Sequence, residues 1–339
     1  MAKTRMTHDT RLLVTGGLGF IGSHFIRYTL TKHRNIRVTN LDKLSTGSDP
    51  ANLKDVEKDE RYRLVKGDIA DKQLVEQLTD NTDATVNFAA ETHVDRSIAD
   101  PWPFINSNTV GATTLFEAAR KREKRILQVS TDEIYGDIIH GSFKEAANLK
   151  PSSPYSASKA AADLFALAYH RTYGLNIVIA RCTNNFGPHQ FPEKLIPKTI
   201  IRALRGLSIP TYGKGLNIRD WIYVVDFCEA LDRMLNKGRS GETYNVSAGN
   251  ELTNIRIVKM ILEIVGKPNN TLTFVEDRPG HDIRYSLDST KLRNEVDWSP
   301  QHSLEDALKT TVEWYTRNEW WWRPLATEPV LHPTPWKLK

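Results

Sequence analysis

The feature that most constrains this sequence is a glycine-rich turn placed between a β-strand and a helix. The apolar run Leu12–Thr15 leads directly into the segment Gly16–Gly22, and an amphipathic helix is expected over Phe20–Thr31. Glycines allow a tight turn and a close approach of the backbone to a pyrophosphate, and the N-terminus of the helix then faces the anion. In this position, the turn predicts a dinucleotide-binding site.

An acidic residue follows the turn at the spacing that such sites use. Asp42 ends the next expected strand, 20 residues after Gly22. A carboxylate there accepts hydrogen bonds from both ribose hydroxyls and repels a 2′-phosphate, which favours NAD over NADP. Lys43 weakens this preference slightly. Asp68, which closes the third strand, is placed to contact the adenine.

The first 180 residues alternate short β-branched runs with helical patterns. Strands are expected over Leu12–Thr15, Ile36–Leu41, Tyr62–Lys66, Thr85–Phe88, Arg125–Val129 and Asn176–Ala180. This βαβ alternation predicts an α/β fold: a doubly wound parallel sheet of the Rossmann type, covered by helices on both faces. A long helix is expected to begin at Pro154, capped by Ser152 or Ser153, and to run to about Tyr173.

After Arg181 the pattern changes to prolines and shorter mixed elements, with helices near 195–205, 226–236, 254–265 and 304–317. This texture indicates a smaller mixed α/β region over the C-terminal edge of the sheet, where ligands bind in such folds. We assign residues 1–180, with a returning segment at about 215–247, to an NAD-binding domain. Residues 181–214 and 248–325 form a substrate-binding domain, and residues 326–339 form an extended tail.

Composition excludes several classes of protein. Lys and Arg number 46 against 41 Asp and Glu, a net charge of +5 that mildly favours anionic ligands such as nucleotide-linked substrates. The sequence has no basic stripe with interleaved aromatic residues, so it does not predict nucleic-acid binding. Two distant cysteines, Cys182 and Cys228, argue against a disulfide scaffold or a metal site and fit a reducing cytoplasm. No apolar run approaches the roughly 18 residues of a membrane span, and Met1–Thr10 lacks the apolar stretch of a signal peptide.

A tyrosine and a lysine stand four residues apart on the helix that begins at Pro154. Tyr155 and Lys159 share one helix face. A lysine ammonium beside a phenol stabilises the phenolate and lowers its pKa, so the tyrosine can take a proton from an alcohol while hydride leaves the carbon. Such a pair is also frequent on surface helices, and only the nucleotide loop favours the catalytic reading.

Two adjacent carboxyl groups follow an expected strand upstream of this pair. Thr131 ends the strand and is placed to bond the hydroxyl that Tyr155 deprotonates, and Asp132 and Glu133 come next. Mutual repulsion and burial would raise one pKa, so one group holds a proton while the other accepts one. Position at the end of a strand leaves two readings open: an acid–base pair, or two solvated carboxylates.

Together, these motifs resemble an extended short-chain dehydrogenase/reductase and, within that group, the dTDP-glucose 4,6-dehydratase family. The matching segments cover residues 11 to about 324: the glycine loop, Asn87–Glu91, Thr131–Gly136, Tyr155 with Lys159, Arg181–Gly187, Phe191–Pro197, Tyr212–Gly215, Ile218–Tyr223, Asp277–His281 and Asn318–Trp321. The resemblance implies a redox-neutral dehydration with NAD as cofactor. Tyr155, Lys159 and Thr131 would serve oxidation at C4 of the sugar, Glu133 would take the C5 proton, and Asp132 would protonate the departing C6 hydroxyl.

The resemblance also implies ligand contacts. For NAD these are Gly16, Gly19, Phe20, Ile21, Gly22, Asp42, Lys43, Leu44, Ser45, Asp68, Ile69, Phe88, Ala89, Ala90, Thr92, Ser107, Tyr155, Lys159 and Asn185. For the nucleotide sugar they are Thr92, Thr131, Asn184, Lys194, Leu195, Pro210, Tyr212, Arg219, Asn254, Arg278 and His281. A tyrosine at 212 can stack on a pyrimidine, and Arg219 and Arg278 suit a diphosphate because a guanidinium donates in a fork. Taken alone, Arg219 with Asp220 also reads as a local ion pair, and His281 as a turn residue.

The sequence departs from the family at two places. The segment Ser45–Pro50 replaces the family's usual continuation, which puts further adenosine-ribose contacts in doubt. The stretch between Asn254 and Asp277 is short, which leaves open whether the nucleotide of the substrate is dTDP or UDP. The alternative functions are those of a UDP-glucose 4,6-dehydratase, a 4-epimerase, a UDP-glucuronate decarboxylase and a catalytically silent NAD-binding protein. Family members are usually homodimers that pair two helices per subunit in a four-helix bundle, here those near 103–122 and 154–173.

Overall fold

The computed structural model describes residues 10–337, so the polar N-terminal stretch considered above and the last two residues lie outside it. Seven parallel strands form the main sheet in the order β10-β6-β5-β4-β1-β2-β3. Their bounds are β1 (Thr10–Thr15), β2 (Ile36–Asp42), β3 (Tyr62–Lys66), β4 (Ala84–Asn87), β5 (Arg125–Thr131), β6 (Ile177–Cys182) and β10 (Thr243–Val246). The predicted doubly wound α/β fold is confirmed, and each expected strand is found within one or two residues.

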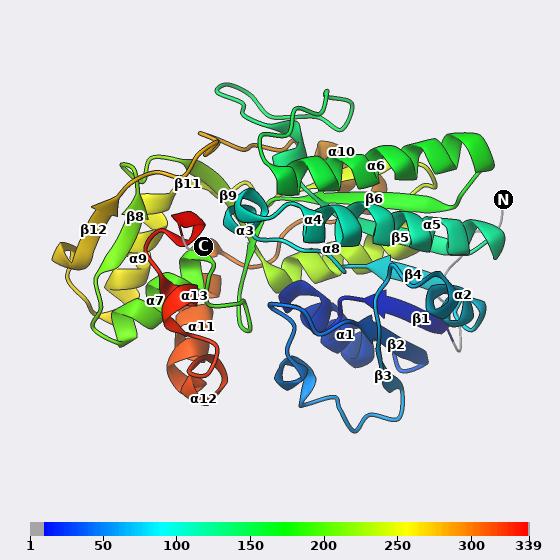
Figure 1. The fold of residues 1–339 in the computed structure, drawn as a ribbon, viewed down its shortest axis with the longest axis horizontal. Coiled ribbons are helices and arrows are strands. Elements are labelled where there is room, and N and C mark those ends of the chain that lie inside the picture. Colours follow the sequence, from blue (N-terminus) through cyan, green and yellow to red (C-terminus); the bar gives the residue numbers. More distant parts are fainter. Residues whose placement is uncertain (1–9, 338–339) are drawn as a thin grey trace.

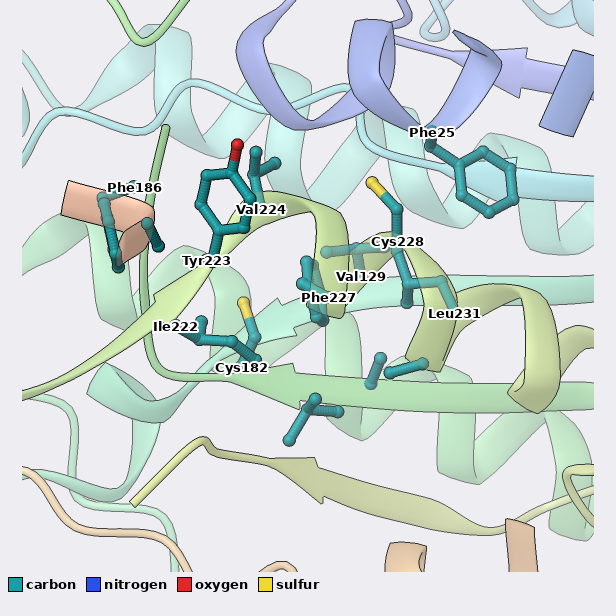
Figure 2. Packing of buried hydrophobic residues seen from close by; sticks show 14 of the residues in the cluster. Phe25, Val129, Cys182, Phe186, Ile222, Tyr223, Val224, Phe227, Cys228 and Leu231 are labelled. Atoms are coloured by element: carbon teal, nitrogen blue, oxygen red, sulfur yellow. The ribbon is translucent and has the colours of Figure 1, made fainter. Parts of the chain in front are cut away.

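Helices cover both faces of this sheet (Figure 1). On one face α1 (Phe20–Lys32) packs against α8 (Val224–Lys237), and on the other α5 (Ala112–Lys121) packs between α2 (Lys72–Asp80) and α6 (Pro154–Tyr173). Figure 2 shows the core on the α1 and α8 side, which includes Phe25 of α1, Phe227 of α8, Val129 of β5 and Cys182 of β6. Strands buried on both faces explain the continuous apolar runs in the sequence.

The helix that carries the Tyr–Lys pair begins where the sequence predicts. The Ser153 hydroxyl accepts a hydrogen bond from the Ser156 N–H at 3.1 Å, and the Ser156 hydroxyl accepts one from the Ser153 N–H at 3.0 Å, which forms a capping box around Pro154. Gly174 ends the helix in the left-handed conformation, at φ +70°. This cap fixes the first turn of α6, and with it the place of Tyr155.

The remaining elements lie beyond the carboxyl ends of the main strands (Figure 1). They comprise a three-stranded sheet of β11 (Glu251–Thr253), β9 (Ile218–Tyr223) and β7 (Asn184–Phe186), and a two-stranded sheet of β12 (Leu272–Val275) and β8 (Ile209–Tyr212). Their helices are α7 (Leu195–Leu204), α9 (Asn254–Val265) and α11 (Leu304–Arg317), whereas α10 (Thr290–Val296) packs against β10 and α8 at the edge of the main sheet. Two short helices, α3 (Val94–Ala99) and α4 (Trp102–Phe104), and a π-helical turn (Ile105–Gly111) precede α5.

The C-terminal segment differs from the extended tail that the sequence predicts. In residues 326–337, the described part of that tail, the chain forms α13 (Glu328–Leu331) and a 3-10 turn over Pro335–Lys337, and α12 (Glu319–Trp322) precedes it. Leu331 and two of the three consecutive tryptophans are buried, so apolar burial folds the segment back onto the protein. In the part of the chain that the structure describes, no helix has the length and apolar character needed to cross a membrane.

Candidate active site

The glycine loop shapes one end of a cavity of about 260 Å³. Gly16 has φ +69°, and a Cβ there would stand 2.6 Å from the Ala89 nitrogen; a Cβ on Gly22 would stand 2.4 Å from the Gly16 oxygen. Neither position tolerates a side chain. The first turn of α1 therefore lies close against the loop, and its N–H groups, which have no partner within the helix, are available to a pyrophosphate.

Asp42 is fixed at the end of β2 by two backbone groups. Its carboxylate accepts hydrogen bonds from the N–H of Leu18 at 2.9 Å and of Leu44 at 2.8 Å. Leu44 is the exception among the expected cofactor contacts: it adopts φ +60°, its side chain packs against the core, and it does not line the cavity. Its contribution is the backbone N–H that orients Asp42.

The structure brings the other expected cofactor residues together around this cavity. They are Gly16, Gly19, Phe20, Ile21, Gly22, Asp42, Lys43, Ser45, Asp68, Ile69, Phe88, Ala89, Ala90, Thr92, Ser107, Tyr155, Lys159 and Asn185. The loop that departs from the family also lines it, through Thr46, Gly47 and Ser48. A glycine cradle at a helix N-terminus, a buried strand-end carboxylate and a long cavity fit an NAD molecule.

Tyr155 and Lys159 lie at the far end of the same cavity, both buried. The Lys159 ammonium donates to the Val129 carbonyl at 2.7 Å, which anchors it to β5. Burial, and then the charge of Glu133, raise the pKa of Tyr155 well above its usual value, while a hydrogen bond with Thr131 lowers it in part. Burial of the phenol, rather than the Lys159 charge, sets the direction of this shift in the protein alone, opposite to the lowering that the Tyr–Lys spacing predicts.

Asp132 and Glu133 form the first turn after β5, and the solvated reading of this pair is wrong. The Asp132 side chain accepts a hydrogen bond from the Thr131 hydroxyl at 3.1 Å, and its second oxygen, also buried, has no partner in the described residues. Burial, and then the Glu133 charge, raise the pKa of Asp132 well above its usual value. Burial also raises the pKa of Glu133, but Arg278, Arg219 and Lys194 oppose that shift. Asp132 is therefore the better proton holder and Glu133 the better acceptor.

A second cavity, of about 170 Å³, joins the first. The two share five lining residues: Thr92, Glu133, Asn184, Glu193 and Lys194. Every expected substrate residue lines one or both cavities, with Thr131 in the first and Leu195, Pro210, Tyr212, Arg219, Asn254, Arg278 and His281 in the second. Glu133 thus stands where a molecule in the second cavity would meet one in the first.

The polar residues of the second cavity are held by both long-range and local contacts. Arg278 pairs with Asp95 of α3 at 3.2 Å, and His281 contacts Asp277 at 2.6 Å. Arg219 does not pair with Asp220: it donates to the carbonyls of Ile218 and Asp282, at 2.7 and 2.9 Å. Asp220 instead accepts from the N–H groups of Gly249 and Asn250. The local ion-pair reading of Arg219 is therefore wrong, and its guanidinium lies at the cavity.

Two positioning contacts have no signal in the sequence. Asn108, in the π-helical turn, bonds both the N–H and the carbonyl of Glu91 and donates to the Ser158 hydroxyl, so it joins the 89–92 loop to α6. Arg96 donates to the Thr46 hydroxyl at 2.9 Å and pairs with Glu193 at 3.0 Å, and so bridges two sides of the first cavity. The Asn108 contacts depend on the packing of the π-helical turn against α6, and the Arg96 contacts on the packing of α3 against two loops, so neither follows from a local motif.

A parallel sheet with a glycine loop, a buried Tyr–Lys pair and a cavity for a dinucleotide defines an extended short-chain dehydrogenase/reductase. Residues 13–311 match the family model described as GDP-mannose 4,6 dehydratase. The chain is 48% identical over 322 residues to dTDP-glucose 4,6-dehydratase of Streptomyces niveus, covering 94% of this chain and 96% of that protein. This chain belongs to the dTDP-glucose 4,6-dehydratase family.

Solved structures agree with this placement. A double mutant of DesIV, the dTDP-glucose 4,6-dehydratase of Streptomyces venezuelae, crystallised with NAD and DAU bound, is 46% identical with a TM-score of 0.91, over 93% of this chain and all of that one. UDP-glucose 4-epimerase of Thermotoga maritima, with UDP-glucose, is 28% identical with a TM-score of 0.84, over 91% of this chain and 99% of that one. The fold is thus shared with epimerases, while the higher identity lies with the dehydratases.

Proposed function

We propose that this protein is an NAD-dependent nucleotide-sugar 4,6-dehydratase that converts dTDP-glucose to its 4-keto-6-deoxy derivative. The observation that carries the proposal is the pair of the buried Asp132 and the half-buried Glu133 at the end of β5, beside Tyr155. Oxidation or epimerisation at C4 needs only the Tyr–Lys set. Loss of water across C5 and C6 needs a further acid and a further base, and this pair supplies both.

The glycine loop and Asp42 would hold NAD⁺ in the first cavity, where it would supply the acceptor for the C4 hydride and the donor of the same hydride to C6. Tyr155 takes the proton of the C4 hydroxyl, with Thr131 bonded to the same oxygen and Lys159 nearby as the cation. The new ketone acidifies the C5–H, and Glu133 takes that proton. Asp132, held protonated by burial, donates to the C6 oxygen as it leaves as water. A proton then returns to C5, so the net change is the loss of one water.

We assign NAD contacts to the lining residues of the first cavity and substrate contacts to those of the second. We keep the proposed division into residues 1–180 with 215–247, and 181–214 with 248–325, although each cavity draws on both parts: Asn185 lines the first cavity and Arg219 the second. Tyr212 would stack on the base and Arg219 and Arg278 would bond the diphosphate, because a guanidinium offers a bidentate fork. The free, buried cysteines 182 and 228 support a cytoplasmic location.

The function is tested by incubating the pure protein with dTDP-glucose in deuterated water, with UDP-glucose in a parallel reaction. We expect a 4-keto-6-deoxy product from dTDP-glucose that carries deuterium at C5, with no net consumption of NAD. Mass spectrometry and proton NMR of the product read this out. An epimerised sugar without deuterium at C5, or faster dehydration of UDP-glucose, would contradict the proposal.

We also propose a homodimer built from two helices of each subunit. The face formed by α4, the π-helical turn and α6 exposes Trp102, Ile105, Val110, Leu164 and Phe165, at 72%, 41%, 46%, 58% and 44%. These elements pack side by side, and a contiguous apolar face of this kind marks an interface. A second copy would extend the two helices to a four-helix bundle.

Leu164→Glu with Phe165→Glu is expected to convert the dimer to a monomer, because two buried charges in an apolar interface cannot be paired. Light scattering coupled to size-exclusion chromatography gives the mass directly. Ile139→Glu, at a residue that is equally exposed (57%) but outside this face, serves as the control and should leave the dimer intact. A wild-type protein that elutes as a monomer would contradict the proposed dimer.

A further inference from the structure

The C-terminal segment up to Lys337 packs against a wall of the second cavity. It follows residues 13–311, the part of the chain that the family model matches. Figure 1 shows this segment, in red, passing from α12 by α7 toward α3, where the chain ends. Two cations of α7 hold its backbone: Arg202 donates to the Leu331 carbonyl at 2.8 Å, and Lys198 to the His332 carbonyl at 3.3 Å. The buried Leu331 side chain anchors the same stretch in the core.

The terminal 3-10 turn touches both strands of the two-stranded sheet. The ring of Trp336 meets the ring of Tyr212 at nearly a right angle, 84°, with centroids 4.8 Å apart. The Lys337 ammonium pairs with the Glu276 carboxylate. Tyr212 is the last residue of β8, and Glu276 follows the last residue of β12. The turn thus ties the carboxyl ends of β8 and β12 together.

These strands need such support. A two-stranded sheet is marginally stable by itself, and this one carries Tyr212 and leads into the loop that holds Arg278 and His281. The terminal turn also packs on α3, whose Asp95 lies 3.5 Å from the Tyr212 hydroxyl and pairs with Arg278. Three parts of the cavity wall therefore meet at this turn.

Trp336 itself does not line the cavity, whereas Tyr212 does. The other aromatic neighbour of Tyr212 is His281, edge-on at 6.2 Å and so a looser contact. A near-perpendicular aromatic contact restrains the plane of a ring while leaving a face available for stacking. We propose that Trp336 is a positioning residue that fixes the Tyr212 ring for stacking on the nucleobase, so that the C-terminal turn sets nucleotide affinity. This inference rests on the proposed function, which assigns the nucleotide to the second cavity.

The test measures dTDP binding to the NAD-loaded protein by calorimetry, together with kcat and KM for dTDP-glucose. Trp336→Ala is expected to raise the Kd for dTDP and the KM about 3- to 10-fold, the range that one aromatic pair supports. Its kcat should stay within about twofold, because Asp132, Glu133 and Tyr155 are untouched. Trp336→Phe should recover most of the affinity, since it keeps an aromatic ring at the contact.

Two controls separate positioning from general stability. Trp320→Ala removes an exposed tryptophan of α12 that contacts Asn318 and Lys54 instead of the cavity wall, and it should leave the Kd for dTDP unchanged. In a Tyr212→Ala background, Trp336→Ala should add no further loss, because its effect passes through that ring.

Unchanged dTDP affinity in Trp336→Ala, or an equal loss with and without Tyr212, would overturn the inference. A wild-type protein that binds dTDP but forms no deoxy-ketone would contradict the proposed function alone. In that case, the ratio of dTDP affinities between Trp336→Ala and the wild type would still decide the role of the C-terminal turn. A wild-type protein that binds no dTDP would overturn both.

Discussion

Tyr155→Phe is expected to lower kcat for dTDP-glucose dehydration by about 10³-fold while NAD remains bound, the size of effect that removal of a positioned base produces. The substitution removes one oxygen from a buried ring and leaves its edge contact with Phe104 in place. Without the phenol oxygen, the C4 hydroxyl loses its proton acceptor, and hydride transfer stops before any later step. Rapid mixing with dTDP-glucose, followed through the absorbance of reduced nicotinamide, measures this step directly.

The matched control is Tyr173→Phe, which removes the same atom at the exposed C-terminal end of α6. It should keep the wild-type rate and the wild-type NAD content. If Tyr155→Phe still reduced the nicotinamide at the wild-type rate, another group would have to accept the C4 proton. The raised pKa of Tyr155 in the protein alone agrees with a base that ionises only beside added positive charge, which the nicotinamide ring provides when bound.

Local sequence signals predicted much of the fold. The capping box at Ser153 with Pro154 sets the start of α6 to the residue, because all its atoms lie within one turn of chain. The glycine loop is equally local: its geometry follows from close backbone approaches that exclude a Cβ. The strand positions followed from continuous apolar runs, which a sheet buried on both faces requires.

The rest depends on contacts between residues that are distant in the sequence. Arg278 and Asp95 are 183 positions apart, so no spacing rule joins them. The folded C-terminal segment is likewise a tertiary effect, because α7 supplies the cations that bind its carbonyls. The direction of the Tyr155 pKa shift was also missed, since the Tyr–Lys spacing reveals the cation but not the depth of burial that opposes it.

Asp132→Asn is expected to separate oxidation from water loss. Asparagine keeps the size of the side chain and still accepts the hydrogen bond that the Thr131 hydroxyl donates at 3.1 Å. It cannot supply the proton that the C6 oxygen needs to leave as water. We therefore expect formation of the deoxy-ketone to fall by about 10²- to 10⁴-fold, while oxidation at C4 proceeds and reduced nicotinamide accumulates. Folding should be little affected, because burial raises the pKa of Asp132 and disfavours its charged form, and the amide keeps the shape of the carboxyl group.

Glu133→Gln is the matched variant, and proton exchange at C5 separates the two roles. In deuterated water, sugar recovered from Asp132→Asn should gain deuterium at C5, because Glu133 still removes that proton from the ketone. Sugar recovered from Glu133→Gln should gain none, although its nicotinamide is also reduced.

If neither variant accumulated reduced nicotinamide, the carboxyl pair would act in the first oxidation, and the division between Tyr155 and the acid–base pair would be wrong. If both variants exchanged C5–H equally, Glu133 would not be the base, and the cations Arg278, Arg219 and Lys194 that favour its ionised form would serve substrate binding alone.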